Sequence, residues 1–394
     1  MAYCVLPAAV ATSTGTHDIN ELLEAHDGSI ALGLRRCLSA LSGQIGPANL
    51  TCLTTPVGGT LTLGACDVTK DTRPMFCFTL DTEPDNLWEV QDTLKFSHFE
   101  FLADFHSELT RRGARPTYLT TSEVAEDPGS RAVMLRILET GSAEVGAHFH
   151  TWTRPWPFTV PALGAPPLQA MAHQLGPEVE ERMLSFTCES LSRHLGTRPV
   201  SYRGGRWSLG RNSIGALQNC GIKIDTTVTP GRSWTDPTHR LVDGPDYREF
   251  PRRPFFLQPG SLEPRSSGPV LELPVGAAHR PATGVRSVIN AMRRRLRTPP
   301  AAPRSKLDWV WLRPTSMSLP QLSGCLRGLA ADTIPVWVAM IHSSEIIPCV
   351  PLKTDEAVRA FKERCFRLVE EAQELGARCA TLREAGEAYG NAGA

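Results

Sequence analysis

Short apolar runs alternate with amphipathic stretches from about residue 75 to residue 385. The apolar runs are typical of strands buried on both faces, and we expect them at 75–80, 117–120, 143–150, 199–203, 222–228, 270–275 and 335–341. The stretches between them carry the spacing of helices that cover a sheet, and these are expected at 96–109, 131–138, 178–194, 213–219 and 355–375. Alternation at this spacing favours parallel strands joined by crossover helices.

The number of these units, about seven, favours an α/β fold of barrel type over an open sheet. We assign the barrel to residues 74–388, with a basic, proline-ended insertion at 283–306 that we interpret as a solvated loop. Residues 1–73 are rich in Gly, Ser, Thr and Ala, with one helix signal at 18–41. We expect this N-terminal extension, of unassigned role, to pack loosely or to be partly disordered.

Composition and charge exclude several classes of protein. Lys and Arg number 41 and Asp and Glu number 41, so the formal net charge of the 394 residues is zero and no nucleic-acid partner is expected. No uncharged apolar run approaches the roughly 20 residues of a membrane-spanning helix. The first residues contain no Lys or Arg and are interrupted by Pro7, and the 11 cysteines form no Cys-x-x-Cys pair. We therefore expect a cytoplasmic protein with reduced thiols.

Two pairs of polar residues follow predicted strands. Asp81 and Glu83 come at the end of the first strand, and His148 and His150 close the third. In extended chain, residues i and i+2 face the same way, so each pair can point at one place. Two imidazoles and a carboxylate form an open site for a catalytic divalent metal, and the second carboxylate could act as a base. Alternatively, the acidic pair belongs to a turn and helix cap, and the histidines to the core or surface.

Two further strand ends carry groups of possible use in catalysis. Arg203 precedes a pair of glycines in Tyr-Arg-Gly-Gly-Arg-Trp, where backbone and guanidinium could approach a carboxylate closely. His342 ends the strand at 335–341 and could donate a proton to a leaving group. The simpler alternatives are a salt bridge in a loop for Arg203 and a hydrogen-bonded capping histidine for His342.

The ordered motifs Phe-Thr-Leu-Asp-Thr-Glu-Pro-Asp-Asn, Gly-Ala-His-Phe-His-Thr-Trp, Tyr-Arg-Gly-Gly-Arg-Trp, Leu-Glu-Leu-Pro-Val and His-Ser-Ser-Glu resemble those of NodB-type polysaccharide deacetylases. These enzymes form carbohydrate esterase family 4, and the resemblance, over residues 75–385, is greatest to a bacterial branch written with Asp-x-Glu and His-x-His. It implies a distorted (β/α) barrel with one divalent metal.

Carried over residue by residue, the resemblance implies that Asp81 is the general base, oriented by Arg203, and that His342 is the general acid. The implied metal ligands are Glu83, His148 and His150. The best-known members have adjacent aspartates and His-x-x-x-His instead, so the division of roles between Asp81 and Glu83 stays open. The motif around Glu272 also lacks the family's usual aspartate.

The implied activity is removal of an acetyl group from an N-acetylated sugar of a polysaccharide or glycoconjugate. Trp152 and Trp207, with Arg206 beside them, would bind the sugar, although tryptophans also serve as packing. Zinc suits the ligand types, and iron, cobalt, nickel or manganese would fit them too. The alternatives are a non-catalytic sugar-binding relative and a glycoside hydrolase, which needs carboxyls about 5–10 Å apart across the sugar. The particular sugar and the oligomeric state are left open.

Overall fold

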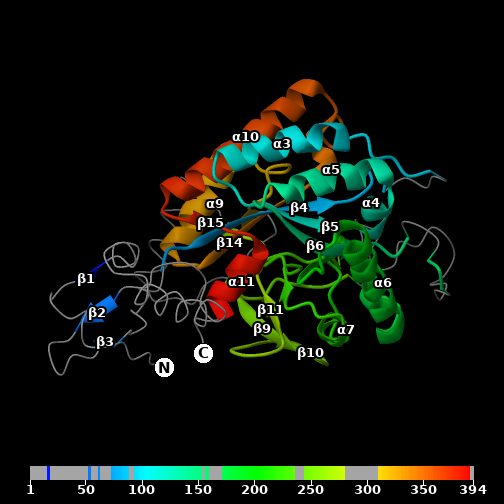
Figure 1. The fold of residues 1–394 in the computed structure, drawn as a ribbon, viewed down its shortest axis with the longest axis horizontal. Helices are drawn as coiled ribbons and strands as arrows, with labels where there is room; N and C mark the ends of the chain where they lie inside the picture. Colours follow the sequence, from blue (N-terminus) through cyan, green and yellow to red (C-terminus); the bar gives the residue numbers. More distant parts are fainter. Residues whose placement is uncertain are drawn as a thin grey trace, which may run out of the picture. The chain divides into compact units, whose positions relative to one another are not determined.

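Figure 1 shows the computed structural model of the chain. It describes residues 72–87, 93–152, 156–158, 171–235, 244–279 and 309–390, and the backbone of three short strands nearer the N-terminus. The chain divides into two compact units, Met1–Thr72 and Arg73–Ala394. In the first unit, β1 (Thr16–His17), β2 (Cys52–Thr54) and β3 (Leu61–Thr62) form an antiparallel sheet. The predicted helix at 18–41 and the basic insertion at 283–306 lie outside the described residues.

Seven parallel strands form the centre of the second unit. In spatial order they are β11 (Val270–Glu272), β8 (Ile224–Asp225), β7 (Ser201–Gly204), β6 (Glu144–Phe149), β5 (Thr117–Thr120), β4 (Met75–Thr82) and β14 (Val336–His342). A parallel bridge between Val275 and Val338 joins the two ends of this run, so the sheet curls into a distorted barrel. The predicted α/β fold of barrel type is therefore confirmed.

Shorter strands extend this sheet or lie beside it. β9 (Phe255–Gln258) pairs antiparallel with β11 and with β10 (Ser261–Arg265), and β15 (Arg378–Cys379) pairs with β4. A separate antiparallel pair, β12 (Ala277–His279) and β13 (Trp309–Trp311), follows the bridge at Val275. Because Leu312 N donates to Gly276 O and Met340 N to Leu312 O, this pair is held against β14.

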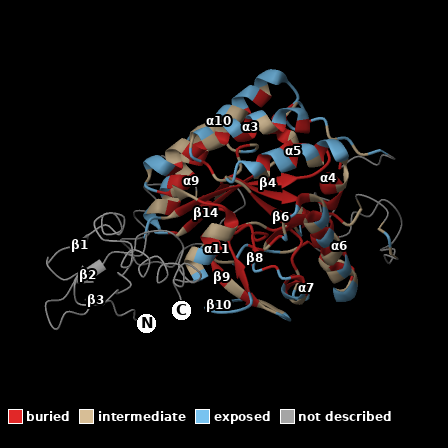
Figure 2. Cartoon of the chain, in the orientation of Figure 1, coloured by how far each residue is buried: buried red, intermediate tan, exposed pale blue. Residues whose placement is uncertain are grey.

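Helices cover the outer face of the sheet, and Figure 2 shows their exposed faces turned away from the buried strands. They are α3 (Phe99–Arg111), α4 (Ser122–Glu126), α5 (Pro128–Glu139), α6 (Pro177–Leu195), α7 (Ser213–Asn219), α9 (Leu319–Ala331) and α10 (Asp355–Glu374). The last helix, α11 (Leu382–Gly390), packs instead at the amino-terminal end of the barrel. Local sequence sets their ends: α6 begins at a proline and ends before Gly196, which has a φ of 69°. None of the described helices is both long and apolar enough to cross a membrane.

The strands bury both of their faces. Phe76, Phe78 and Leu80 of β4 pack under the outer helices, whereas Met75 and Cys77 join a second apolar cluster with strand residues across the barrel. Leu382 of α11 packs into this second cluster, which fills the amino-terminal end of the barrel. On the same face of β4 as Met75 and Cys77, the next residues are Thr79 and Asp81. The barrel interior therefore changes from apolar to polar toward the carboxyl ends of the strands.

Two local predictions differ from the structure. The strand expected at 222–228 has ladder pairing only at Ile224–Asp225. Beyond Asp225, hydrogen bonds that involve side chains replace the backbone ladder: Thr226 Oγ1 donates to Leu273 O (2.7 Å), and Val228 N donates to Glu272 Oε1 (3.0 Å). Helix α9 was not predicted, since Gly324 and Gly328 weaken its signal. Gly328 lies against β12, where an added Cβ would be 2.9 Å from Ala278 Cβ.

The stability of the fold should depend on pH through Glu180 of α6. This side chain is 2% exposed, its Oε1 accepts from Ser213 Oγ (2.6 Å), and burial raises its pKa to about 7. The pKa of Glu180 is higher in the folded than in the unfolded protein. Its contribution to the free energy of unfolding is therefore fully present below pH ~4.5 and is lost as pH rises through 7. Glu180→Gln should therefore gain up to about 3 kcal/mol of unfolding free energy relative to the wild type between pH 5 and pH 8.

Urea unfolding of both proteins at the two pH values measures this difference. Glu178→Gln, an exposed position in the same turn of α6, is the matched control and should show none. A difference between Glu180→Gln and wild type that does not change with pH would rule out the titration of Glu180 as its cause.

Candidate metal and catalytic site

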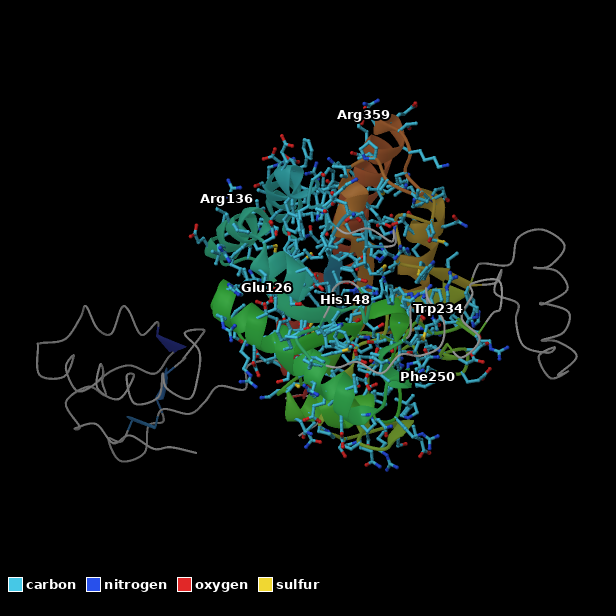
Figure 3. The ribbon with its side chains drawn as sticks, turned by 90° about the vertical axis from the view of Figure 1, so that its right-hand side faces the viewer. Glu126, Arg136, His148, Trp234, Phe250 and Arg359 are labelled. Carbon is cyan, nitrogen blue, oxygen red and sulfur yellow. The ribbon has the colours of Figure 1, made fainter. Side chains whose placement is uncertain are left out.

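Strand register brings the predicted site residues to one edge of the barrel. Asp81 at the end of β4 is the register partner of His342 at the end of β14, and His148 in β6 is the partner of Arg203 in β7. The predictions placed these residues at four separate strand ends. Figure 3 shows His148 in the interior of the described body, in contrast to Arg136 and Arg359 at its surface.

Glu83, His148 and His150 form a compact cluster of possible metal ligands. Oε2 of Glu83 lies 3.0 Å from Nε2 of His150 and 3.3 Å from Nε2 of His148, and the two Nε2 atoms are 3.1 Å apart. All three side chains are buried. Burial opposes ionisation of Glu83, but hydrogen bonds from the two imidazoles lower its pKa well below the ordinary value. An ionised carboxylate thus faces two ring nitrogens.

The three groups fit a divalent cation. Ligand atoms about 2.0–2.2 Å from a shared cation are about 2.9–3.4 Å from each other in tetrahedral or octahedral geometry, which matches the separations in this cluster. His148 Nδ1 lies 2.7 Å from Arg203 O, so the carbonyl fixes the ring with Nε2 toward the cluster. Two imidazoles and one carboxylate are a ligand set that leaves coordination positions open.

Asp81 lies beside the cluster and is held by Arg203. The Nη1 atom of the fully buried Arg203 donates to Asp81 Oδ1 (2.6 Å). Burial raises the pKa of Asp81, but the charge of Arg203, helped by His148 and His342, outweighs it and lowers the pKa. Arg203 also donates through Nε to Thr226 O (3.0 Å) and through Nη2 to Thr79 Oγ1 (2.9 Å). Asp81 is therefore fixed as an ionised carboxylate whose second oxygen faces His342.

His342 is oriented by Glu345 on one side and faces the carboxylates on the other. Its Nδ1 lies 3.3 Å from Glu345 Oε1, and its Nε2 lies 3.8 Å from Glu83 Oε1 and 4.0 Å from Asp81 Oδ2. Burial and Arg313 lower the pKa of His342, whereas Glu345 and Glu83 raise it, and the net shift is upward. Glu345 is itself held by Thr315 Oγ1 (2.6 Å) and Arg313 Nη2 (3.2 Å). Nε2 of His342 is thus placed to hold a proton over the site.

The paired glycines after Arg203 allow the chain to pass close to the cluster. A Cβ on Gly205 would lie 2.4 Å from Phe149 O and 2.8 Å from His150 Nδ1, and one on Gly204 would lie 2.0 Å from Ser208 O. The next two residues, Arg206 and Trp207, have φ values of 56° and 61°. Two adjacent side-chain-bearing residues in the left-handed region store strain of the kind found at functional sites. Tyr247 Oη, which donates to Trp207 O (2.7 Å), helps to hold this turn.

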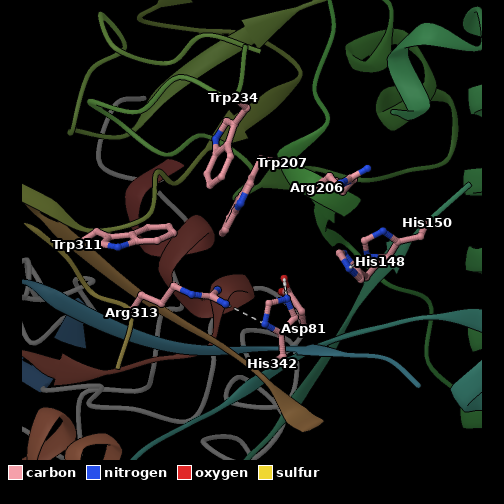
Figure 4. A pocket seen from close by; sticks show the side chains of 10 residues that line it. Asp81, His148, His150, Arg206, Trp207, Trp234, Trp311, Arg313 and His342 are labelled. Carbon is pink, nitrogen blue, oxygen red and sulfur yellow. Dashed lines mark hydrogen bonds and ion pairs between the residues drawn. The ribbon is translucent and has the colours of Figure 1, made fainter. Parts of the chain in front are cut away.

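These groups open onto a cavity of about 290 Å³ with an aromatic wall, shown in Figure 4. It is lined by Asp81, His148, His150, Gly204, Arg206, Trp207, Trp234, Trp311, Arg313 and His342. The rings of Trp207 and Trp234 are stacked, with centroids 5.8 Å apart and an interplanar angle of 19°, and Trp311 lies within 6.4 Å of both. Such a wall suits the apolar face of a sugar ring.

The structure places the three predicted sugar-binding residues differently from one another. Trp207 and Arg206 line the cavity, whereas Trp152 packs edge-on against His150 at 4.6 Å, and its Nε1 donates to Leu87 O (3.1 Å). Three further lining residues were not predicted: Trp234 lies in the loop after β8, Trp311 is the last residue of β13, and Arg313 follows β13 by two residues. Their only sequence signal is that of aromatic and cationic residues close to predicted strands.

No protein-family profile and no curated protein matches the chain, but solved structures do. A polysaccharide deacetylase candidate from Mycobacterium smegmatis matches with a TM-score of 0.42 and 13% identity, over 86% of this chain and 98% of that one. A 4-α-glucanotransferase from Thermococcus litoralis has a TM-score of 0.45 and 12% identity, over 79% of this chain and 40% of that one. A family 4 carbohydrate esterase from Streptomyces lividans, in complex with acetate, has a TM-score of 0.38 and 10% identity, over 78% and 92%.

Deacetylases and family 4 carbohydrate esterases recur among the other matches, together with a family 4 pseudoenzyme from Bacillus anthracis. At these identities the likeness concerns the fold alone.

Gly205→Ala should weaken metal binding through His150. The new methyl group cannot occupy its position without moving His150 or the Phe149 carbonyl, so we expect the affinity for zinc to fall about 10- to 100-fold. Zinc titration of metal-free protein, with elemental analysis after dialysis, measures the change. Gly215→Ala in α7, where an added Cβ meets nothing within 4 Å, is the matched control, and His148→Ala is the reference for a lost ligand. Wild-type affinity in Gly205→Ala would show that His150 is not a ligand in its present position.

Proposed function

We propose that the chain is a metal-dependent hydrolase that removes the acetyl group from an N-acetylated sugar of a polysaccharide or glycoconjugate. The observation that carries this proposal is the convergence of Glu83, His148 and His150 beside Asp81 and His342 in one tryptophan-walled cavity. The two alternative functions, glycoside hydrolysis and sugar binding without catalysis, do not account for all of this arrangement.

Glu83, His148 and His150 would hold one divalent cation, for which zinc is our first choice from the ligand types; iron, cobalt, nickel and manganese would also fit. When bound, the cation would supply a Lewis acid for the acetamide carbonyl oxygen and would acidify water. Asp81, ionised and fixed by Arg203, accepts the proton of the attacking water. The tryptophans hold the sugar, and the cavity restricts access of other solvent.

Breakdown of an amide requires a second proton transfer, because an amine anion is a very poor leaving group. Nε2 of His342 faces the carboxylates, and its raised pKa favours the protonated ring. His342 therefore donates the proton to the departing sugar nitrogen, while Glu345 holds the opposite ring nitrogen. The free amino sugar and acetate are the products.

The glycoside hydrolase alternative fits the geometry less well. A general acid in such an enzyme needs a carboxyl with a raised pKa on the opposite side of the sugar from its partner. Glu83 has a lowered pKa and is held by two imidazoles, and Glu83 and Asp81 approach the same nitrogen of His342. The two carboxylates thus lie on one side of the site, as ligand and base require.

The zinc-loaded protein should release acetate from N-acetylated sugar oligomers, and Asp81→Asn should lower this rate at least about 100-fold, since no other group is placed to take the proton. Asp81→Asn should keep its metal, which elemental analysis checks. Asp104→Asn, an exposed position in α3, is the matched control. Cleaved glycosidic bonds without acetate would favour the glycoside hydrolase, and sugar binding with neither product would favour the non-catalytic relative.

His342→Ala should distinguish an acid from a merely structural histidine. Hydrolysis of the acetamide should fall at least about 100-fold, whereas hydrolysis of p-nitrophenyl acetate, whose leaving group needs no proton, should fall less than about 10-fold. Steady-state rates on both compounds provide the comparison, with His194→Ala as a control away from the site. Equal losses on the amide and the ester would disprove the assignment of His342 as the acid.

A further inference from the structure

One guanidinium beside the cavity has no acidic partner among the residues that the structure describes. Arg232 lies half-buried in the loop after β8, with its Cζ 4.0 Å from the centre of the Trp311 ring. Among the described residues, its side chain contacts the face of this ring and pairs with no carboxylate. Burial and then the charge of Arg313 lower the pKa of Arg232 to about 10, which leaves it protonated at neutral pH.

Three other arginines of the second unit each pair with a carboxylate. Arg203 is paired with Asp81 (2.6 Å), Arg252 with Asp332 (2.8 Å) and Arg313 with Glu345 (3.2 Å). A cation drawn partly out of water is normally matched by a carboxylate, because its desolvation is otherwise uncompensated. A cation–π contact compensates only part of that cost. Arg232 therefore retains an unneutralised charge.

A second guanidinium lies at the same tryptophan, inside the cavity. Arg313 Cζ is 5.6 Å from the centre of the Trp311 ring, and Figure 4 shows the side chain reaching from this ring toward His342. Its Nη2 lies 3.1 Å from His342 Nδ1. Within the described ranges, Arg313 pairs with one carboxylate, that of Glu345, which also binds Thr315 and the His342 backbone N–H. Two guanidinium groups lie here, and the carboxylate of Glu345 is already hydrogen-bonded to other groups. The charge at this end of the cavity is therefore positive.

We propose that Arg232 and Arg313, which both lie within 6 Å of the centre of the Trp311 ring, form an anion subsite, so that the substrate is an N-acetylated sugar carrying a phosphoryl or carboxylate group. Guanidinium groups bind both anions through paired N–H donors. The subsite adjoins the proposed acid His342, which places the anionic group next to the sugar that is deacetylated. This inference rests on the proposed function for the acetyl group, but the anion subsite can be tested without turnover.

The test measures equilibrium binding by calorimetry to the full chain carrying zinc and Asp81→Asn, at low salt. The probes are N-acetylglucosamine, N-acetylglucosamine 1-phosphate and the corresponding N-acetylated uronic acid. We expect at least one anionic probe to bind about 10-fold more tightly than the neutral sugar, and this preference to shrink as salt is raised. Tighter binding of the phosphate alone identifies a phosphorylated substrate, and tighter binding of the uronic acid alone identifies a carboxylated one.

Arg232→Met, which keeps the stem on Trp311 but removes the charge, should reduce the preference at least 5-fold, and Arg232→Lys should restore part of it. Arg248→Met is the matched control, because it removes an exposed arginine paired with Asp246. Arg232→Gln serves as a second neutral variant if Arg232→Met does not fold. Equal binding of the neutral and anionic probes would overturn the proposed subsite. A preference for the anionic probes that persists in Arg232→Met would also overturn it, because the anion would then be bound by the metal. Acetate release tests the proposed function separately.

Discussion

A guanidinium with no exposed surface holds the carboxyl edge of the barrel together. Arg203 extends from β7, donates to Asp81 and Thr79 on β4 and to the Thr226 carbonyl after β8, while its own carbonyl lies 2.7 Å from His148 Nδ1. A charge buried to this extent is tolerated only when its hydrogen bonds are made, and breaking one such pair typically costs about 3–5 kcal/mol. The guanidinium thus fixes the proposed base, and the backbone carbonyl of the same residue fixes one proposed ligand. The geometry of the candidate site and the stability of the fold therefore both depend on Arg203.

Parallel register explains why residues so far apart in sequence could be predicted to meet. Once the runs ending at Asp81, His148, Arg203 and His342 are assigned to parallel strands, their carboxyl ends must lie at one edge. The pairing of Asp81 with His342 and of His148 with Arg203 follows from the ladder alone. The family resemblance then supplied roles that position by itself could not.

Other parts of the molecule could not be predicted because tertiary contacts decide them. Trp311 belongs to the three-residue strand β13, which reaches Trp207 through its pairing with β12 after the closure at Val275. Trp234 lies in the loop after β8 and stacks on Trp207 from there. The turn at Arg206 has a backbone conformation that local preference disfavours, and the surrounding packing imposes it. Helix α9 carries two glycines that weaken its helix signal, and one of them, Gly328, allows a close approach to β12.

The second apolar cluster, at the amino-terminal end of the barrel, limits the passage of molecules through the barrel. Met75, Cys77, Val338 and Leu382 pack together there, with exposed fractions of 6% or less. In the part of the chain that the structure describes, they leave no rear passage behind Asp81. Under the proposed function, acetate formed at Asp81 would therefore depart through the same mouth by which the sugar arrived. The order in which acetate and the amino sugar leave would then be set by which of them obstructs that mouth.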